Sequence, residues 1–366
     1  MNVIDANRHP PINITGTGAI SASYDTAQWN APPLDGANGV GHEELLHRIR
    51  STLPEAIVDR VIKDERFYDK GSLMALLAAF ESMAGLGHEM TSLRRMDARD
   101  TGFICSSYGG PFHWNLVNNC TVPVERLDRP PFNRLTAVVG YHGGVIGNVT
   151  IPLEMNGASQ VISDMDSSGI SALIYAVESI FDGNGESYVV GGVETCVSDM
   201  SREQLEHVLD TNVGRNVRMG DGAAFCHVES DARSKTLGRT SLVRIESMSV
   251  GLRTAQVAEH VTRGLASHED GNRFHITVVD FQALRRGEEP LIRGLRSLSH
   301  EKPHDFIHEA GFFFGATASM AMVELVETLL DAGAGYGGGD TCRGVLVTRD
   351  LNGFCAILEL TREYRT

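Results

Sequence analysis

The segment Val161-Ile-Ser-Asp-Met-Asp-Ser-Ser-Gly-Ile-Ser-Ala-Leu173 decides how the rest of this chain is interpreted. A short β-type run, Gln160 to Ser163, meets the start of an apolar helix at a corner made of small residues. Helix N-termini stabilise negative charge, so many enzymes present a nucleophile at such a corner. This corner carries Asp166 and has the form of a nucleophile site without an obvious nucleophile.

The composition is that of an ordinary globular protein with an excess of acids. The chain has 366 residues, 42% hydrophobic and 22% charged, which is enough to bury a large core. Its net charge is −15. Proteins that bind nucleic-acid duplexes usually have the opposite sign, so we expect no nucleic-acid partner.

The sequence has no targeting or metal-binding pattern. The N-terminus, Met1 to Arg8, lacks a basic start followed by an apolar core, so we expect no signal peptide. No apolar run reaches the roughly 18 residues that a membrane helix needs. The cysteines form neither CxxC nor CxH spacings, at positions 105, 120, 196, 226, 342 and 355. We therefore expect a cytoplasmic protein with reduced core thiols, no membrane association, no metal and no cofactor.

The order of apolar runs predicts an α/β layered fold. Helical periodicity extends over 70–86, where Leu73, Leu76 and Phe80 share one face, and over 167–181. A further helix is expected at 43–53. The strands expected in this part of the chain are 12–21, 101–106, 157–163, 187–192 and 222–229.

The pattern then restarts, which indicates an internal duplication. The elements expected after residue 240 are strand 241–249, helix 255–266, strand 274–280, helix 316–330, and strands 344–348 and 353–360. These sets predict two βαβαβ-type halves, about 1–240 and about 241–366. No low-complexity linker divides them, so we expect one unit over residues 1–366.

Local patterns along the chain resemble one family. They are Ile14-Thr-Gly-Thr-Gly-Ala-Ile-Ser21, Gly102-Phe-Ile-Cys-Ser-Ser-Tyr-Gly-Gly110, the 135–147 region, the corner at 161–173, Val190-Gly-Gly-Val-Glu194, Gly220-Asp-Gly-Ala-Ala224 and Gly311-Phe-Phe-Phe-Gly-Ala-Thr317. In this order they resemble the β-ketoacyl synthase branch of the thiolase-fold superfamily. The resemblance implies a five-layer α-β-α-β-α thiolase fold, with residues 135–147 at the family's dimer face.

The resemblance also shows that the catalytic positions have changed together. The family's active cysteine falls on Asp166, and its second histidine falls on Phe312. The first histidine belongs just after the strand 276–280, where the chain reads Asp-Phe281-Gln-Ala without a histidine. Ile307 stands at the position where the resemblance implies a lysine. The degenerate positions are thus Asp166, Phe281 and Phe312, together with Ile307.

These departures remove what a decarboxylating condensation needs. That reaction requires a cysteine thiolate to hold the acyl group and two histidines to stabilise the enolate and oxyanion. An acyl-aspartate at Asp166 would be a labile anhydride, and Phe281 and Phe312 would fill the pocket with apolar bulk. We therefore expect no condensing activity. This set of replaced catalytic residues resembles the one found in chain-length-factor subunits. The segment Asp350–Phe354 also resembles the corresponding segment of those subunits.

The resemblance implies partners and a substrate tunnel. A chain-length factor pairs with an active ketosynthase and shapes its acyl tunnel, so we expect that heterodimer, or else a homodimer, and contact with an acyl carrier protein. Tyr108 falls where the family lines its acyl pocket, with Phe112 and Trp114 nearby. These aromatic side chains either set the depth of the tunnel or pack at the dimer face.

Other interpretations stay open. Asp166 at a helix start is in the simplest case an N-cap for free backbone N–H groups. Alternatively, the chain is a repurposed enzyme in which Asp166, Asp164 or His308 performs acid–base or acyl-transfer chemistry on a carrier-bound acyl substrate. Asp164 would raise the pKa of Asp166 if both faced one cavity. A buried polar cavity joining these residues would favour this alternative. A third, weaker interpretation is a structural or regulatory scaffold that binds the acyl carrier protein without shaping the product.

Overall fold

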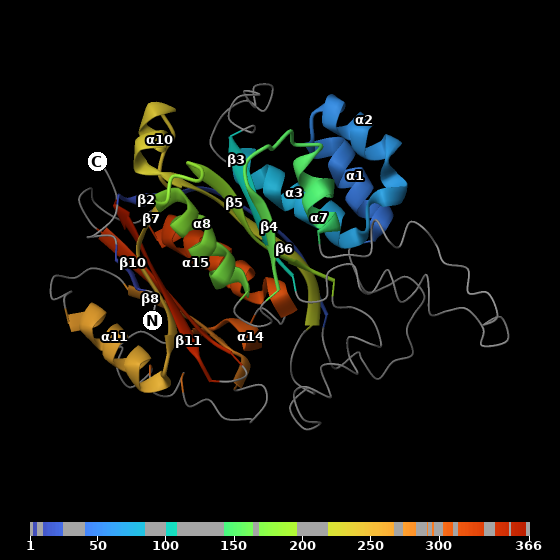
Figure 1. Cartoon of the computed structure of the whole chain (residues 1–366). Coiled ribbons are helices and arrows are strands. Elements are labelled where there is room, and N and C mark those ends of the chain that lie inside the picture. The colour runs from blue at the N-terminus through green and yellow to red at the C-terminus, as the bar shows by residue number, and fades with distance from the viewer. Residues whose placement is uncertain are drawn as a thin grey trace, which may run out of the picture.

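A mixed sheet of eleven strands runs through the molecule (Figure 1). The computed structural model describes residues 3–5, 10–24, 41–84, 100–107, 143–163, 168–195, 219–266, 274–282, 291, 295, 303–309, 314–332, 341–350 and 353–363. Within them the strand order is β4-β3-β5-β6-β2-β7-β11-β10-β8-β9, and β1 pairs with β7.

The first half of the sheet has a defined topology. Its strands are β2 (Ile12–Tyr24), β3 (Thr101–Ser106), β4 (Ser159–Ile162), β5 (Ser187–Glu194) and β6 (Met219–Ser230). Counted along the chain, they lie side by side in the order 3-2-4-5-1. The β3 strand is parallel to β4 and β5, whereas β6 is antiparallel to β5 and β2.

The second half repeats that topology. Its strands are β7 (Val243–Leu252), β8 (Phe274–Asp280), β9 (His304–Asp305), β10 (Thr341–Arg349) and β11 (Cys355–Glu363). They again lie in the order 3-2-4-5-1, with the fifth strand antiparallel to its neighbours. The duplication expected from the sequence is therefore confirmed. The halves join where β2 pairs antiparallel with β7. The short strand β1 (Val3–Asp5) also pairs antiparallel with β7.

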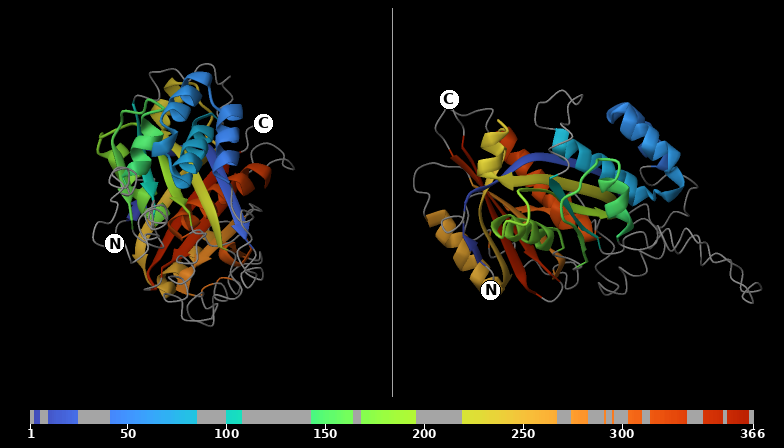
Figure 2. Two further views of the ribbon diagram at one scale, coloured as in Figure 1. Left: turned by 90° about the vertical axis from the view of Figure 1, so that its right-hand side faces the viewer. Right: turned by 45° about the horizontal axis from the view of Figure 1, so that its top comes forward.

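Helices separate and cover the two halves (Figures 1 and 2). The α3 helix packs on β2, β5 and β6, α8 and α15 lie between the halves, and α11 packs on β11. The result is the expected five-layer α-β-α-β-α arrangement. The helix bounds are α1 (His42–Thr52), α2 (Glu55–Lys63), α3 (Lys70–Ala84), α7 (Gly144–Thr150), α8 (Ser168–Phe181), α10 (Asp231–Thr236), α11 (Thr254–Ala266), α14 (Phe306–Glu309) and α15 (Thr317–Asp331), with 3-10 turns η2 (Glu65–Phe67) and η6 (Phe314–Ala316).

Three apolar clusters fill the spaces between these layers. The central cluster joins the inner faces of both half-sheets to α8 and α15, and includes Ile170, Leu173 and Met322. A second cluster lies under α3, and a third lies under α11. The α3 helix is buried on nearly all sides because α1 and α7 cover the face that the sheet leaves open. This explains why its sequence is apolar well beyond one stripe.

The predicted elements agree with the structure, with a few local differences. The strands at 101–106 and 274–280 have the predicted bounds. The β4 strand is shorter than predicted. The sequence analysis missed α2, α10, β1 and β9, which are short elements; β9 has only two residues. Such short elements depend on tertiary contacts more than on periodicity.

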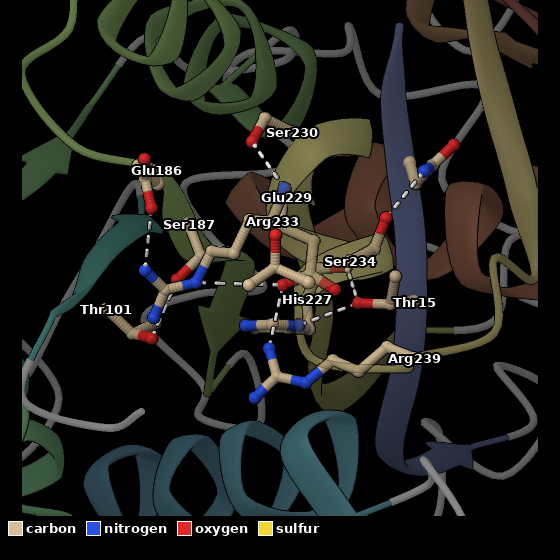
Figure 3. Close-up of polar contacts among 12 residues, drawn as sticks. Thr15, Thr101, Glu186, Ser187, His227, Glu229, Ser230, Arg233, Ser234 and Arg239 are labelled. Carbon is tan, nitrogen blue, oxygen red and sulfur yellow. Dashed lines mark hydrogen bonds and ion pairs between the residues drawn. The ribbon is translucent and has the colours of Figure 1, made fainter. Parts of the chain in front are cut away.

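A row of buried polar residues crosses the first half-sheet at the amino ends of its parallel strands. Thr101, Ser187, Glu229 and Asn13 are register partners on β3, β5, β6 and β2. The Thr101 and Ser187 hydroxyls lie 2.8 Å apart, and Arg239 Nη1 donates to Glu229 Oε2 at 2.7 Å. Figure 3 shows Arg233 and Arg239 directed at the Glu229 and His227 side chains. The paired charges let the sheet end in buried polar groups here.

His227 is the titratable group most affected by this environment. Its side chain is buried, and Thr15 Oγ1 lies 2.7 Å from its Nδ1 (Figure 3). Burial, together with the smaller effect of the nearby Arg239 and Arg233 guanidinium groups, lowers the pKa of His227 from 6.5 to about 3. The imidazole is therefore neutral in the folded protein at pH values where the unfolded chain already binds a proton.

We predict that His227 makes the fold sensitive to acid. As the pH falls below about 6.5, only the unfolded chain takes up this proton, so the free energy of unfolding should fall by about 1.4 kcal/mol per pH unit until the folded pKa is reached. His227→Gln should remove that part of the slope. Urea unfolding between about pH 4 and pH 7 measures it.

The same substitution at His47 provides the control, because that side chain of α1 is exposed in the folded protein. His47→Gln should leave the slope as in the parent. An unchanged slope in His227→Gln, whatever its absolute stability, would contradict the prediction.

Candidate functional site

The candidate site lies at the carboxyl ends of β3, β4 and β5. The corner that was singled out in the sequence connects β4 to α8, and its residues 164–167 lie outside the described residues. Ser168 and Gly169, which begin α8, are buried. Ser106 and Ser107, at the end of β3, are also buried. The described residues at the end of β3 and at the start of α8 are therefore small and buried.

The start of α15 packs directly against the start of α8 and the end of β5. A Cβ atom at Gly169 would stand 2.5 Å from Ser319 Oγ and 2.8 Å from Ser319 N. A Cβ atom at Gly192 would stand 2.3 Å from Ser106 Oγ and 3.0 Å from Gly315 O. Ser106 Oγ donates to Gly315 O at 2.9 Å. The segment from η6 into α15 thus packs into space beside Gly169 and Gly192 that a larger residue at either position would fill.

Two of the changed family positions lie in the described part of the site. Phe281, just after β8, is 1% exposed, and Ile307 in α14 is also 1% exposed. Both belong to the central apolar cluster, together with Val279, Phe306 and Ala316. The positions where the resemblance expected a histidine and a lysine are therefore occupied by core side chains.

The other predicted site residues cannot be placed in the same way. Asp164, Asp166, Tyr108, Phe112, Trp114 and Phe312 lie outside the described residues. His308 belongs to α14, but its side chain also lies outside them. Their roles stay predictions.

A buried ion pair that the sequence analysis missed closes the end of the second half-sheet. Asp280 and Arg349 are register partners at the last positions of β8 and β10. Arg349 Nε donates to Asp280 Oδ1 at 2.8 Å and Nη2 to Oδ2 at 2.5 Å, with both side chains at most 4% exposed. This two-point contact fixes the direction of both strand ends. Spacing along the chain contains no signal for it, because the residues are 69 positions apart.

A small pocket at the end of β5 was also missed. It is lined by Asp69, Gly71, Ser72, Ser107, Val145, Val193, Glu194 and Thr195. Asp69 caps α3, since its Oδ1 accepts from Ser72 N at 3.0 Å. Lys70 forms an ion pair with Asp221, which is 1% exposed. The motifs Val190–Glu194 and Gly220–Ala224 pointed to these strand ends, but not to the charges that meet there.

The described residues give no sign of a metal centre. Within the described ranges, no three His, Cys, Asp or Glu side chains are grouped so as to hold a metal ion. Cys105, Cys226, Cys342 and Cys355 are buried free thiols. Burial raises the pKa of the Cys355 thiol to about 11, so it is protonated near neutral pH. Among the described helices, none is long and apolar enough to cross a membrane.

The duplicated 3-2-4-5-1 half-sheets, with α8 and α15 between them, define a thiolase-fold protein. The model of the β-ketoacyl synthase N-terminal domain matches residues 25–214, which is more than half of the chain. The chain therefore belongs to the β-ketoacyl synthase family, as the sequence patterns predicted.

Solved structures agree on the fold. The ishigamide ketosynthase/chain length factor is similar at a TM-score of 0.65 and 17% identity, over 97% of this chain and 100% of that one. A chain of a type II PKS acyl-carrier protein in complex with its ketosynthase gives 0.66 and 14%, over 96% and 99%. An oxazolomycin ketosynthase domain from Streptomyces albus JA3453 gives 0.64 and 16%, over 98% and 75%. At these identities the likeness concerns the fold alone.

We predict that Gly192→Ala will strongly disturb the site. The added Cβ would be too close to Ser106 Oγ and to the backbone at Gly315, so α15 and η6 must shift. Overpacking of this kind costs about 1–3 kcal/mol, which denaturant unfolding will measure.

Gly147→Ala is the matched control for this change. A Cβ there would meet only Ile151 Cδ1, at 3.8 Å, inside the helix α7. This variant should gain roughly 0.5–1 kcal/mol from helix propensity. Equal stability of the two alanine variants would show that the close approach at Gly192 is not a constraint.

We also predict that Asp280→Ala will cost about 3–5 kcal/mol, because it leaves the Arg349 guanidinium buried without its carboxylate. The double variant Asp280→Leu/Arg349→Met removes both charges and should be more stable than the single variant. Thermal or chemical unfolding compares the two. If the single variant were the more stable one, the ion pair would not be what holds the strand ends.

Proposed function

We propose that this chain is a ketosynthase-like subunit without condensing activity of its own. It pairs with a competent β-ketoacyl synthase that works on carrier-bound acyl chains, and it bounds the tunnel in which the acyl chain grows, in polyketide, polyene or fatty-acid-like biosynthesis. The observation that carries this proposal is the coordinated loss of Cys, His, His and Lys at Asp166, Phe281, Phe312 and Ile307, on a scaffold that keeps the family's topology.

The packing of the described positions supports the absence of condensation. Phe281 and Ile307 are core residues, so neither leaves room for a group that would stabilise an enolate or an oxyanion. Asp166 as a carboxylate would have to form an anhydride where the family forms a thioester. Among the described residues, none at the carboxyl ends of β3, β4 and β5 is a histidine. The buried His227 of β6 lies toward the amino end of the neighbouring strand β5.

Two further observations support a role in pairing. The β4 strand is at the edge of the sheet, bonded to β3 on one side, and Ser159 and Gln160 are exposed. Unpaired strand edges attract another chain unless they are protected. One of the similar structures is described as a ketosynthase/chain length factor, and another is a complex of a ketosynthase with its acyl-carrier protein.

The proposal is tested by reconstitution with each intact ketosynthase found encoded near this chain, together with an acyl carrier protein. Alone, the chain should neither condense nor decarboxylate malonyl groups on the carrier, as measured by mass spectrometry of the carrier-bound products. Together with the ketosynthase, it should copurify and change the product length. Condensation by this chain alone would refute the proposal.

A tunnel role for the aromatic residues predicts a change in product length. Phe112→Ala should lengthen the product by at least one extender unit, because it removes bulk from the proposed tunnel wall. Phe112→Leu keeps most of the bulk and serves as the control. If both variants give the parent product while still binding the ketosynthase, Phe112 does not bound the tunnel.

A further inference from the structure

The same dipeptide, Asn-Gly, occurs four times in the chain, at 38–39, 156–157, 184–185 and 352–353. In such a pair the backbone nitrogen of the glycine can attack the side-chain amide of the asparagine, because glycine has no Cβ atom to hinder the approach. The first pair lies outside the described residues. For the other three, the structure shows what the reacting glycine nitrogen contacts.

The reaction replaces the amide of the asparagine by a carboxyl group. The glycine nitrogen loses its proton and bonds to the asparagine Cγ, and the Cγ–Nδ2 bond breaks. The amide nitrogen takes up the proton and leaves as ammonia, so that a five-membered succinimide ring remains. Water then opens the ring at either carbonyl and gives aspartate or isoaspartate. The glycine nitrogen must therefore be free to turn toward the side chain before it.

Two of the three glycine nitrogens are held by hydrogen bonds. Gly157 N donates to Thr101 O at 3.2 Å, and Gly353 N donates to Asp350 O at 3.0 Å. Gly157 is also tightly enclosed, because a Cβ atom placed there would stand 2.4 Å from the nearest backbone nitrogen of β3. The side chain of Asn156 is exposed, so water reaches its amide. What this pair lacks is a free glycine nitrogen.

Asn184 and Gly185 lie in the turn between α8 and β5. The helix ends at Gly183, whose φ is 72°, with Gly183 N donating to Ile180 O at 3.1 Å and Asn184 N to Ser179 O at 2.9 Å. After this helix end, no hydrogen bond is found from Gly185 N to any described residue. The side chain of Asn184 is exposed. This pair therefore combines an accessible amide with a free glycine nitrogen.

Tyr188 contacts the same peptide group. Its Oη donates to Asn184 O at 3.3 Å. This carbonyl and the Gly185 N–H belong to one peptide unit, so the oxygen shares the negative charge when the nitrogen loses its proton. A hydrogen bond to the charged form favours that form. Burial raises the pKa of Tyr188, so the phenol remains a donor at mildly alkaline pH.

We propose that Asn184 is a modification site, where attack by Gly185 N converts the asparagine to aspartate or isoaspartate, and that the fold protects Asn156 in an otherwise identical pair. The product carries a new negative charge between the exposed acids Asp182 and Glu186. The proposal goes beyond the function proposed above and does not depend on it, because it uses only the contacts of these turns.

Incubation of the full chain at mildly alkaline pH tests the proposal. Peptide mass spectrometry follows the gain in mass at each asparagine when its amide becomes a carboxyl group. Asn184 should be modified at least about fivefold faster than Asn156, because the hydrogen bond from Gly157 to Thr101 must open before that pair can react. Equal rates at the two positions, or a faster rate at Asn156, would overturn the proposal.

The unfolded chain is the control for intrinsic reactivity. In concentrated urea both glycine nitrogens are free, so Asn184 and Asn156 should be modified at similar rates. If the difference between them persisted in urea, it would come from the neighbouring residues, and protection by the fold would be refuted.

Tyr188→Phe tests the assistance by the phenol, since this variant keeps the buried ring and removes only the hydroxyl. In the folded protein it should slow the modification of Asn184 at least about twofold and leave the rate at Asn156 unchanged. An unchanged rate at Asn184 would overturn the part assigned to Tyr188.

Discussion

The arrangement of the site depends on the close approach of two helix starts. The first turn of α15 meets the first turn of α8 at Gly169 and the end of β5 at Gly192, with less room than a methyl group needs. Because α15 follows β9 in the second half-sheet while α8 follows β4 in the first, this contact connects the two halves at the start of α8. The hydrogen bond from Ser106 to Gly315 adds a polar link at the same point.

Around this contact the described positions are packed as core. Phe281 and Ile307 belong to the central apolar cluster, at positions where the sequence resemblance predicted polar catalytic groups. Burying them stabilises the layers next to the corner, since apolar burial contributes roughly 1.5–3 kcal/mol per large side chain.

Charge is confined to positions where the structure pairs it or exposes it. Three ion pairs with buried carboxylates lie near strand ends: Asp280 with Arg349, Asp221 with Lys70, and Glu229 with Arg239. Each fixes an end of a strand that apolar contacts alone leave free to slide.

The sequence by itself determined the layered fold and the duplication, because periodicity and ordered motifs depend on local residues; the loss of catalytic residues stays a prediction from the same motifs. The bounds of β3 and β8 and the apolar length of α3 were readable for the same reason. Only the tertiary structure decided which distant residues meet. Three of these contacts join residues far apart in the chain: the ion pair of Asp280 with Arg349, the packing of Ser319 against Gly169, and the row of polar residues that includes Glu229. No spacing rule predicts them, since strand register and helix packing set those distances only after the chain has folded.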